Sequence, residues 1–205
     1  MARIMKGHYS KKFEQYGASP EGVDWGKKHR EVELMLKMSG IILEPSLEGM
    51  SILDVGCGYG AFYGYLKKHF KGVPRYTGID LCDNMVREAK AEHRKNNFIA
   101  GDFMAYDFGK KKFDYVICNG IFTQKLTANN SEMFEYLKSF IKKMDKLSKK
   151  GFVFNVMSTH VNFKVRNLYY LDPAKILSYL LSNVSKNVKL DHSYGFYEYT
   201  CYVRK

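Results

Sequence analysis

The feature that most constrains this chain is a short apolar segment that runs directly into a glycine-rich turn. Residues 52–62 read Ile-Leu-Asp-Val-Gly-Cys-Gly-Tyr-Gly-Ala-Phe. Glycines at Gly56, Gly58 and Gly60 let the backbone bend sharply and let a ligand approach the main chain closely. The helix expected after the turn offers unpaired N–H groups and the positive end of its dipole. We therefore expect a nucleoside-type cofactor at this turn.

An acidic residue beside the turn separates two kinds of cofactor. Asp54 stands two residues before the first glycine, which makes the spacing D-x-G-x-G-x-G. Dinucleotide sites use G-x-G-x-x-G and present N–H groups to a pyrophosphate, which a neighbouring carboxylate would repel. A carboxylate suits a ligand that carries a cation, such as an ammonium or a sulfonium. An NAD-type Rossmann domain is the structural alternative.

Three further segments follow the turn in a fixed order. Residues 76–80 read as a second strand that ends in Asp80, residues 98–103 as a third strand motif, and residues 113–120 as a fourth strand. Together with the glycine turn, these segments resemble the motifs of class I S-adenosylmethionine (SAM)-dependent methyltransferases. The order of four motifs is a more specific signal than a single glycine turn.

The resemblance implies SAM as the cofactor and S-adenosylhomocysteine (SAH) as its product. In such enzymes an acid in the position of Asp80 accepts from the ribose hydroxyls, and one in the position of Asp102 accepts from the adenine amino group. Phe103 would flank the adenine ring. The expected cofactor-binding residues are Asp54, Gly56, Cys57, Gly58, Gly60, Asp80, Leu81, Met85, Gly101, Asp102, Phe103, Asn119 and Gly120.

Apolar runs alternate with helical patterns along the chain, which predicts an α/β fold of parallel strands joined by crossover helices. The resemblance implies a Rossmann-like, seven-stranded, mostly parallel sheet with an antiparallel last strand, helices on both faces and an N-terminal helical cap. We expect one domain over residues 1–205, with the cap or lid at 1–47 and the core at 48–205. Expected elements are helices at 63–70, 81–93, 132–147 and 173–181, and strands at 151–157, 188–192 and 197–203.

Composition bounds the protein class. The chain has 205 residues and is 45% hydrophobic, enough for one domain with a full core. It contains no run of eighteen apolar residues and no apolar signal-peptide centre near its start, so we expect a cytoplasmic protein without a membrane partner. Its four cysteines show no paired spacing, so we expect neither a metal site nor disulfides.

A net charge of +12 raises the question of anionic partners. Much of that charge follows helical spacing around apolar residues between 137 and 150, the pattern of an amphipathic helix with a solvated outer face. What remains is a bias toward an anionic substrate. The chain lacks a zinc-finger, KH or RRM signature, so nucleic acid is the less favoured partner.

The acceptor is expected outside the carboxyl ends of the fourth and fifth strands, where ligands bind in open parallel sheets. His160 follows the fifth strand and is the candidate base, because imidazoles titrate near neutral pH. His93 falls among lysines on a crossover helix and is expected at the surface. The candidate acceptor-binding residues are Tyr9, Tyr16, Trp25, Phe122, Lys125, Arg166 and Tyr169.

The N-terminal segment has two interpretations. Methyltransferases of this type often use such a segment as a lid, and Gly17, Gly22 and Gly26 around Pro20 form a flexible break. Alternatively, Trp25 only anchors the segment to the sheet domain.

The expected function is methyl transfer from SAM to a small, anionic metabolite, most simply O-methylation of the sugar or secondary-metabolite type. Residues 119–122 read Asn-Gly-Ile-Phe and depart from the (Asp/Asn)-Pro-Pro-(Tyr/Phe) run of enzymes that methylate base amines or glutamine amides. Two alternatives remain open: an RNA methyltransferase that uses the positive charge, and a non-catalytic SAM-binding protein.

Overall fold

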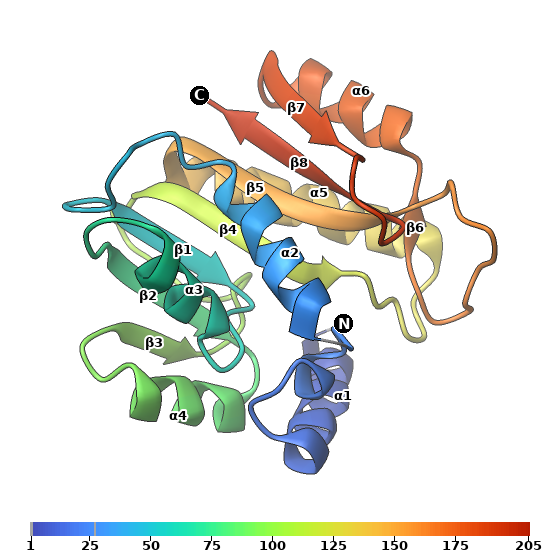
Figure 1. The fold of residues 1–205 in the computed structure, drawn as a ribbon. Coiled ribbons are helices and arrows are strands. Elements are labelled where there is room, and N and C mark those ends of the chain that lie inside the picture. Colours follow the sequence, from blue (N-terminus) through green and yellow to red (C-terminus); the bar gives the residue numbers. More distant parts are fainter. Residues whose placement is uncertain (1, 27) are drawn as a thin grey trace.

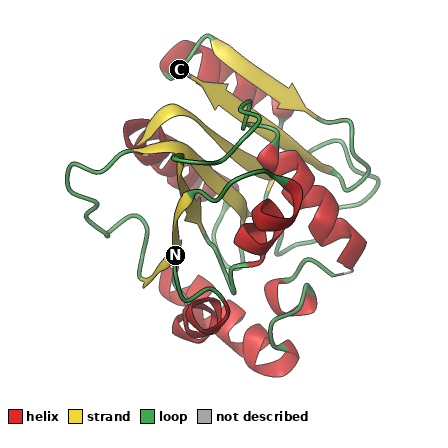
Figure 2. Ribbon diagram, turned by 60° about the vertical axis from the view of Figure 1, so that its left-hand side comes forward, coloured by secondary structure: helices red, strands yellow, loops and turns green. Residues whose placement is uncertain are grey.

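The computed structural model describes residues 2–26 and 28–205, and these form a single sheet with helices on both faces (Figures 1 and 2). The strand order is β3-β2-β1-β4-β5-β8-β7, and a two-residue strand, β6, pairs beside β5. The strands are β1 (Ser51–Val55), β2 (Arg75–Asp80), β3 (Asn97–Ala100), β4 (Phe113–Phe122), β5 (Ser148–Ser158), β6 (Tyr170–Leu171), β7 (Asn187–Asp191) and β8 (Glu198–Arg204).

The direction of the strands agrees with the expected fold class. Strands β1 to β6 pair in parallel, and β8 runs antiparallel to both of its neighbours, β5 and β7. The chain leaves β3 at one edge of the sheet and returns to the middle as β4, beside β1. This reversal opens a crevice between the carboxyl ends of β1 and β4, where α/β sheets bind their ligands. The short β6 is an addition to the seven strands that we expected.

Two hydrophobic clusters cover the two faces of the sheet. One cluster packs α5 and α6 against the sheet, and the other packs α2, α3 and α4 against the opposite face. Figure 1 shows α2 in front of β4 and α5 behind β5. The helical segments are α1 (Ala2–Tyr16), the 3-10 helix η1 (Glu21–Val23), α2 (Lys28–Ser39), α3 (Ala61–His69), α4 (Asp83–Glu92), α5 (Asn130–Leu147) and α6 (Pro173–Asn183).

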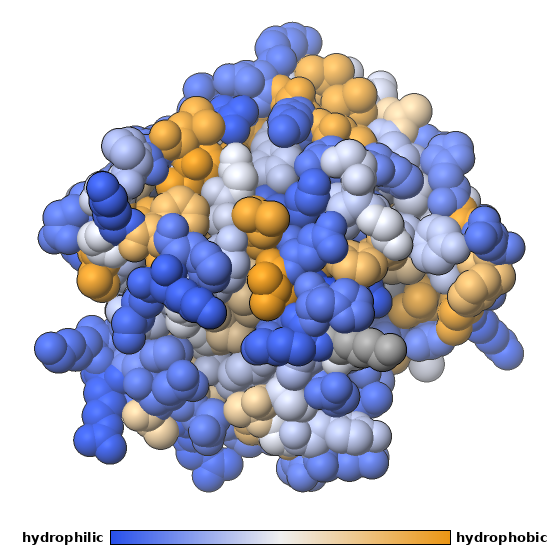
Figure 3. All heavy atoms as spheres, in the orientation of Figure 1, coloured by the Kyte–Doolittle hydropathy of each residue, from blue (hydrophilic) through white to orange (hydrophobic). Residues whose placement is uncertain are grey.

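Local sequence explains where the two helices behind the sheet begin. Asn129 accepts a hydrogen bond from the N–H of Glu132, and the Glu132 carboxylate accepts one from the N–H of Asn129, a reciprocal cap of α5. Asp172 caps α6 in front of a first-turn proline. The lysines of α5 surround six buried apolar side chains, so much of the positive charge lies on a solvated helix face. Figure 3 shows the opposite face of the molecule, with α2 in front, and this face is also mostly hydrophilic.

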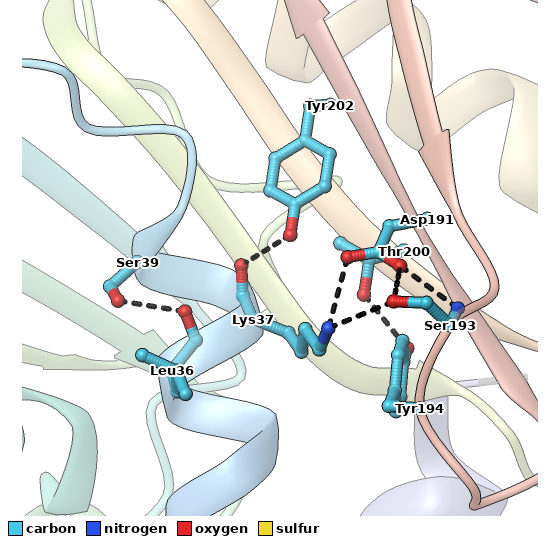
Figure 4. A network of polar contacts seen from close by, with 8 residues as sticks. All are labelled: Leu36, Lys37, Ser39, Asp191, Ser193, Tyr194, Thr200 and Tyr202. Carbon is cyan, nitrogen blue, oxygen red and sulfur yellow. Dashed lines mark hydrogen bonds and ion pairs between the residues drawn. The ribbon is translucent and has the colours of Figure 1, made fainter.

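The N-terminal segment divides into two parts instead of forming one cap. Helix α2 is built into the core: its Lys37 Nζ lies 3.1 Å from Asp191 Oδ2, and the Tyr202 hydroxyl donates to the Lys37 carbonyl at 2.8 Å (Figure 4). Helix α1 and η1 instead pack against each other at the end of the sheet, where α1 also contacts α4. We therefore distinguish the α1–η1 segment, residues 2–26, from α2.

Within residues 2–26 and 28–205, no helix combines the length and the apolar character that a membrane span requires.

Candidate functional site

A cavity opens at the carboxyl edge of the sheet, over the glycine turn and between the ends of β1, β2 and β4. It encloses about 1060 Å³ of atom-free space, including the solvent at its mouth. The α1–η1 segment forms one wall of the cavity with the side chains of Met5, Tyr9, Val23 and Trp25. We call this space the cofactor cavity. Of the predicted cofactor residues, Asp54, Gly56, Cys57, Gly58, Asp80, Leu81, Met85, Gly101, Asp102, Phe103, Asn119 and Gly120 line it.

Backbone hydrogen bonds hold the glycine turn against β2. The N–H groups of Gly56 and Cys57 donate to the carbonyl of Ile79, at 2.8 Å and 3.2 Å. Gly58 has a φ of +53°, and a Cβ atom there would lie 3.6 Å from Val23 Cγ1 and 3.9 Å from Met85 Sδ, two side chains of the cavity wall. The turn therefore presents bare backbone to the cavity, as the sequence predicted.

Gly60 is the one predicted cofactor residue that does not line the cavity, and its neighbour explains why it is a glycine. It has a φ of +85°, and a Cβ atom there would lie 2.9 Å from Cδ2 of His93. The His93 ring is buried, and its Nε2 lies 3.2 Å from the Gly60 carbonyl oxygen. The expectation that His93 is a surface residue is wrong, because its ring packs between α4 and the start of α3.

Asp80 joins the second strand to the glycine turn. Its Oδ2 accepts from the N–H of Gly58 at 2.9 Å, and its Oδ1 accepts from the N–H of Cys82 at 2.8 Å. Burial raises the pKa of Asp80, and the backbone donors partly offset that rise. The carboxylate is thus fixed in orientation at the cavity wall, with lone pairs left for a ligand.

Asp54 is more deeply buried than Asp80. Its carboxyl group accepts a hydrogen bond from the Tyr76 hydroxyl of the neighbouring strand. Burial raises the pKa of Asp54 to about 7, the Tyr76 hydrogen bond opposes the rise, and the charge of Asp80 adds to it. The group therefore changes charge near neutral pH, and a bound cation would favour its ionised form.

The third-strand motif supplies the opposite wall of the cofactor cavity. Oδ1 of Asp102 accepts from the N–H of Met104 at 2.9 Å, which fixes the carboxylate at the end of β3. Phe103 packs against Phe108 and Phe140. Leu81 lines the cavity from the β2–α4 connection and Met85 from the first turn of α4, as expected for an apolar pocket around a ring.

A bulge interrupts β4 at the cavity. Its pairing with β5 is regular from Tyr115 to Cys118 and resumes at Phe122 in a shifted register, so residues 119–121 leave the ladder. Asn119 is 8% exposed, and neither its side-chain oxygen nor its nitrogen has a hydrogen-bond partner among the described residues. Buried amide groups are seldom left unpaired, so Asn119 offers a donor and an acceptor for a ligand of this cavity.

A second cavity of about 620 Å³, again counting open solvent, adjoins the first. The two cavities share Trp25 and Gly120. Gly120 has a φ of +79°, and a Cβ atom there would lie 2.9 Å from the indole nitrogen of Trp25. The Trp25 ring on Gly120 therefore forms part of the partition between the cavities. The second cavity is lined by Asp24, Trp25, Arg30, Leu34, Gly120, Thr123, Gln124, Asn155, Met157, Leu168 and Glu198.

A buried polar chain forms the floor of the second cavity. The N–H of Gly120 donates to Asn155 Oδ1 at 2.7 Å, so the Asn155 side chain replaces a ladder bond lost at the bulge. Asn155 Nδ2 donates to Glu198 Oε2 at 2.6 Å, and Glu198 Oε1 pairs with Arg30 Nη2. Strands β4, β5 and β8 and helix α2 are thereby connected at one point.

The expected acceptor-binding residues divide between the cavities and other places. Tyr9 and Trp25 line the cofactor cavity, and Trp25 also lines the second. The structure places the other five elsewhere. Phe122 and Tyr169 are buried in the core, Lys125 donates to Asn130, Tyr16 is exposed at the end of α1, and Arg166 is exposed on a loop.

His160 also lies outside the lining of both cavities. Its side chain is exposed, its backbone N–H donates to Ser158 Oγ at 3.0 Å, and its ring neighbours that of His192 at 6.4 Å between centroids. The chain turns outward directly after β5, so following that strand in sequence does not bring the imidazole to the site. The base assignment therefore has no geometric support.

Sequence reasoning missed several polar residues of the site, among them Tyr76, Arg30, Asn155 and Glu198. A signal existed for Asn155, a polar residue within the apolar run of β5. Arg30 and Glu198 carried no local signal, because they meet only when α2 packs against β8.

Comparisons with known proteins agree with this geometry. A family model described as a methyltransferase domain matches residues 52–143. A Mycobacterium tuberculosis protein named as a methyltransferase, Rv1506c, is 37% identical over 160 residues, which cover 76% of this chain and 93% of that protein. A malonyl-[acyl-carrier protein] O-methyltransferase of Ilyobacter polytropus is 31% identical over 106 residues, 50% of this chain and 39% of that protein.

A solved structure supports the fold. The magnesium protoporphyrin IX methyltransferase of Synechocystis PCC 6803, determined with bound SAM, superposes with a TM-score of 0.70 at 15% identity. The match covers 100% of this chain and 96% of that one. At this identity the likeness is one of fold.

Proposed function

The chain belongs to the class I, SAM-dependent methyltransferases, and from this premise we propose that it methylates an oxygen atom of a small, anionic metabolite. The observation that carries the proposal is the cofactor cavity itself, which gathers the glycine turn and three acidic residues, Asp54, Asp80 and Asp102, around one space.

The residues of this cavity fit the proposed cofactor. Asp80 presents a fixed carboxylate for the ribose hydroxyls, and Asp102 and Phe103 would hold the adenine ring from the opposite wall. Asp54 offers a carboxylate, and Asn119 an unpaired amide, for the charged amino-acid end. When bound, SAM supplies a methyl group on a positively charged sulfur. The protein's part is to orient that group toward the acceptor and to exclude water.

We propose that the α1–η1 segment covers the bound cofactor. This segment forms one wall of the cavity with Met5, Tyr9, Val23 and Trp25. Helix α2, in contrast, is held to β7 and β8 by the contacts of Lys37. Helix α1 contacts α4 and takes no part in the strand pairing of the described chain, so this wall can open without breaking the hydrogen bonds of the sheet.

Two observations support an acceptor oxygen on an anionic metabolite. The net charge of +12 attracts small anions over long distances. The name of the Ilyobacter relative assigns O-methylation to that protein. An acceptor oxygen is therefore the proposal for this chain.

Calorimetry and isotope transfer test the proposal. SAM and SAH are expected to bind with one site per chain, and NAD is expected not to bind. Protein saturated with methyl-labelled SAM is then incubated with a panel of hydroxy acids, carboxylic acids and sugar phosphates. Matched amines and an RNA pool serve as controls. Label in an amine or in RNA would contradict the proposed acceptor class, and binding of NAD in place of SAM would contradict the cofactor.

A further inference from the structure

We propose that the second cavity holds the methyl acceptor, that the acceptor presents a hydroxyl group there, and that Glu198 takes the proton of that hydroxyl. This inference rests on the proposed function, and it assigns a base to a reaction for which the sequence pointed to His160.

Glu198 is the first residue of β8, and β8 runs antiparallel to β5. Its side chain therefore stands at the same edge of the sheet as the carboxyl ends of β4 and β5, where the cofactor cavity opens. Glu198 is 1% exposed and lines the second cavity. A carboxylate at that depth is costly unless it is paired, and a buried carboxylate in a cleft is a functional candidate.

The surroundings of Glu198 hold it in one orientation. Asn155 donates to one of its oxygens at 2.6 Å, and Arg30 pairs with the other. Each carboxylate oxygen has two lone-pair directions, so both oxygens keep room for a further donor. The remaining carboxylate of the cavity, Asp24, is already engaged by His8 and by Lys12 at 2.9 Å.

A hydroxyl matches this arrangement because it both donates and accepts. Its proton would be accepted by Glu198, and its oxygen would accept from Arg30, whose buried Nε has no hydrogen-bond partner in the described chain. The other lining side chains include Trp25, Leu34, Met157 and Leu168, which form an apolar wall beside the polar floor. Such a wall suits the carbon skeleton of a compact ring.

The polar floor also connects Glu198 to the place where the cavities meet. One amide group, that of Asn155, spans from the Glu198 carboxylate to the backbone N–H of Gly120, and Gly120 and Trp25 belong to both cavities. An acceptor bound to Glu198 therefore lies beside the boundary of the two cavities, where its oxygen must meet the methyl carbon directly.

The step balances as an in-line displacement. The acceptor oxygen forms a bond to the methyl carbon while the sulfur–methyl bond breaks, the sulfur keeps that electron pair, and the hydroxyl proton moves to Glu198. Burial raises the pKa of Glu198 against the opposing effects of Arg30 and Asn155, which makes the carboxylate a better proton acceptor.

The single tryptophan of the chain makes the test direct, because Trp25 lines both cavities. SAH-saturated protein is titrated with phenol and with anisole while Trp25 fluorescence is followed. Anisole has the same ring and oxygen but no O–H donor. Phenol is expected to bind more tightly than anisole, and Glu198→Gln is expected to weaken phenol binding about ten- to a hundredfold while leaving anisole unchanged.

A matched control is Glu44→Gln. Glu44 also pairs with a cation and a neutral donor, Lys150 at 2.6 Å and the Tyr115 hydroxyl at 2.9 Å, but it lines neither cavity. This variant is expected to bind phenol like the unmodified protein. If Glu198→Gln does not fold, the double variant Arg30→Gln with Glu198→Gln removes both charges of the pair and is tested in its place.

The outcomes separate the two proposals. If SAH itself leaves Trp25 fluorescence and calorimetry unchanged, the proposed function fails. If SAH binds but phenol binds no better than anisole, or equally well to the Glu198 variant, the acceptor assignment is overturned and the cofactor assignment stands. A matching loss of methyl transfer from labelled SAM to phenol in the Glu198 variant supports the base role, and full transfer overturns it.

Discussion

The hydroxyl of Tyr76 on β2 donates a hydrogen bond to the carboxyl group of Asp54 on the neighbouring strand β1. Both side chains are buried, and burial raises the pKa of Asp54 to about 7. Asp54, which the sequence suggested as a carboxylate for a cationic ligand, is therefore partly protonated near neutral pH until a cation binds beside it.

This relationship predicts that SAM affinity rises with pH. Below about 7 the free protein holds Asp54 protonated, and binding a cationic group requires loss of that proton. The affinity is expected to fall by up to about tenfold for each pH unit below that value. Calorimetry in buffers of different ionisation enthalpy should record proton release. Asp54→Asn serves as the control, with weaker binding and no such pH dependence. Net proton uptake by the unmodified protein would contradict the assignment.

Asp80→Ala is expected to weaken SAM binding strongly. The change removes hydrogen bonds to the ribose that are worth on the order of 1.5–3 kcal/mol each. It also frees the N–H groups of Gly58 and Cys82, which loosens the turn. Calorimetry measures the loss. Asp107→Ala is the control, because that exposed carboxylate only accepts from the Gly109 N–H. Equal affinities for the two variants would rule out the ribose role.

Gly120→Ala is expected to disturb the partition between the cavities. The new methyl group would lie 2.9 Å from the Trp25 indole nitrogen and displace the ring. Gly109→Ala is the matched control, because Gly109 also has a positive φ, +59°, but no neighbour within 4 Å of the added atom. Both variants carry a backbone strain of roughly 1–2 kcal/mol. Only Gly120→Ala should shift the Trp25 emission maximum, and an unshifted spectrum would refute the contact.

The ion pair of Lys37 and Asp191 predicts acid sensitivity. Burial tends to raise the pKa of Asp191, but hydrogen bonds from Ser193 and Lys37 outweigh it and hold the pKa at about 2, below its ordinary value (Figure 4). The ionised carboxylate therefore stabilises the fold above about pH 4, and this contribution is lost as the pH falls toward 2.

The loss is expected to reach about 2 kcal/mol in the free energy of unfolding. Urea unfolding at several acidic pH values measures it, and Asp191→Asn should flatten this part of the profile. Asp145→Asn is the comparison, because Asp145 pairs with Lys205 at a far more exposed position. A profile that stays unchanged in Asp191→Asn would exclude this source of acid sensitivity.

Removal of α1, residues 1–16, tests the proposed cover. Without Met5 and Tyr9 the cofactor cavity loses part of its apolar wall, so SAM is expected to bind on the order of tenfold more weakly and to dissociate faster. Stopped-flow fluorescence of Trp25 records the rate. Tyr16→Ala is the control, since that side chain is exposed at the end of α1. An unchanged dissociation rate would mean that α1 only supports the fold.

The cofactor side of the site was predictable because it is encoded locally. The glycine turn and Asp80 lie within short motifs, where the placement of each residue at the cavity follows from the few residues around it and from strand direction. The fold class was equally accessible, since alternating apolar runs and helical patterns report parallel strands and crossovers. The element boundaries, the short β6 and the division of the N-terminal segment into two parts differ from the expectation.

The acceptor side was not predictable, because distant segments build it. Arg30, Asn155 and Glu198 lie far apart in the sequence and meet through packing of α2 on β8 and through the bulge in β4. The assignment of His160 as the base lacks geometric support for a related reason. A position directly after a strand does not determine the direction in which the following loop runs. His93 shows the converse, a polar residue whose burial follows from a neighbouring glycine.

The α1–η1 segment lies outside every strand pairing of the sheet, yet its side chains line both cavities. Its residues can therefore change without cost to the hydrogen-bonded scaffold beneath. Proteins that share this scaffold can diverge in the compounds they modify by altering some two dozen amino-terminal positions, and a library that seeks new selectivity should be diversified there first.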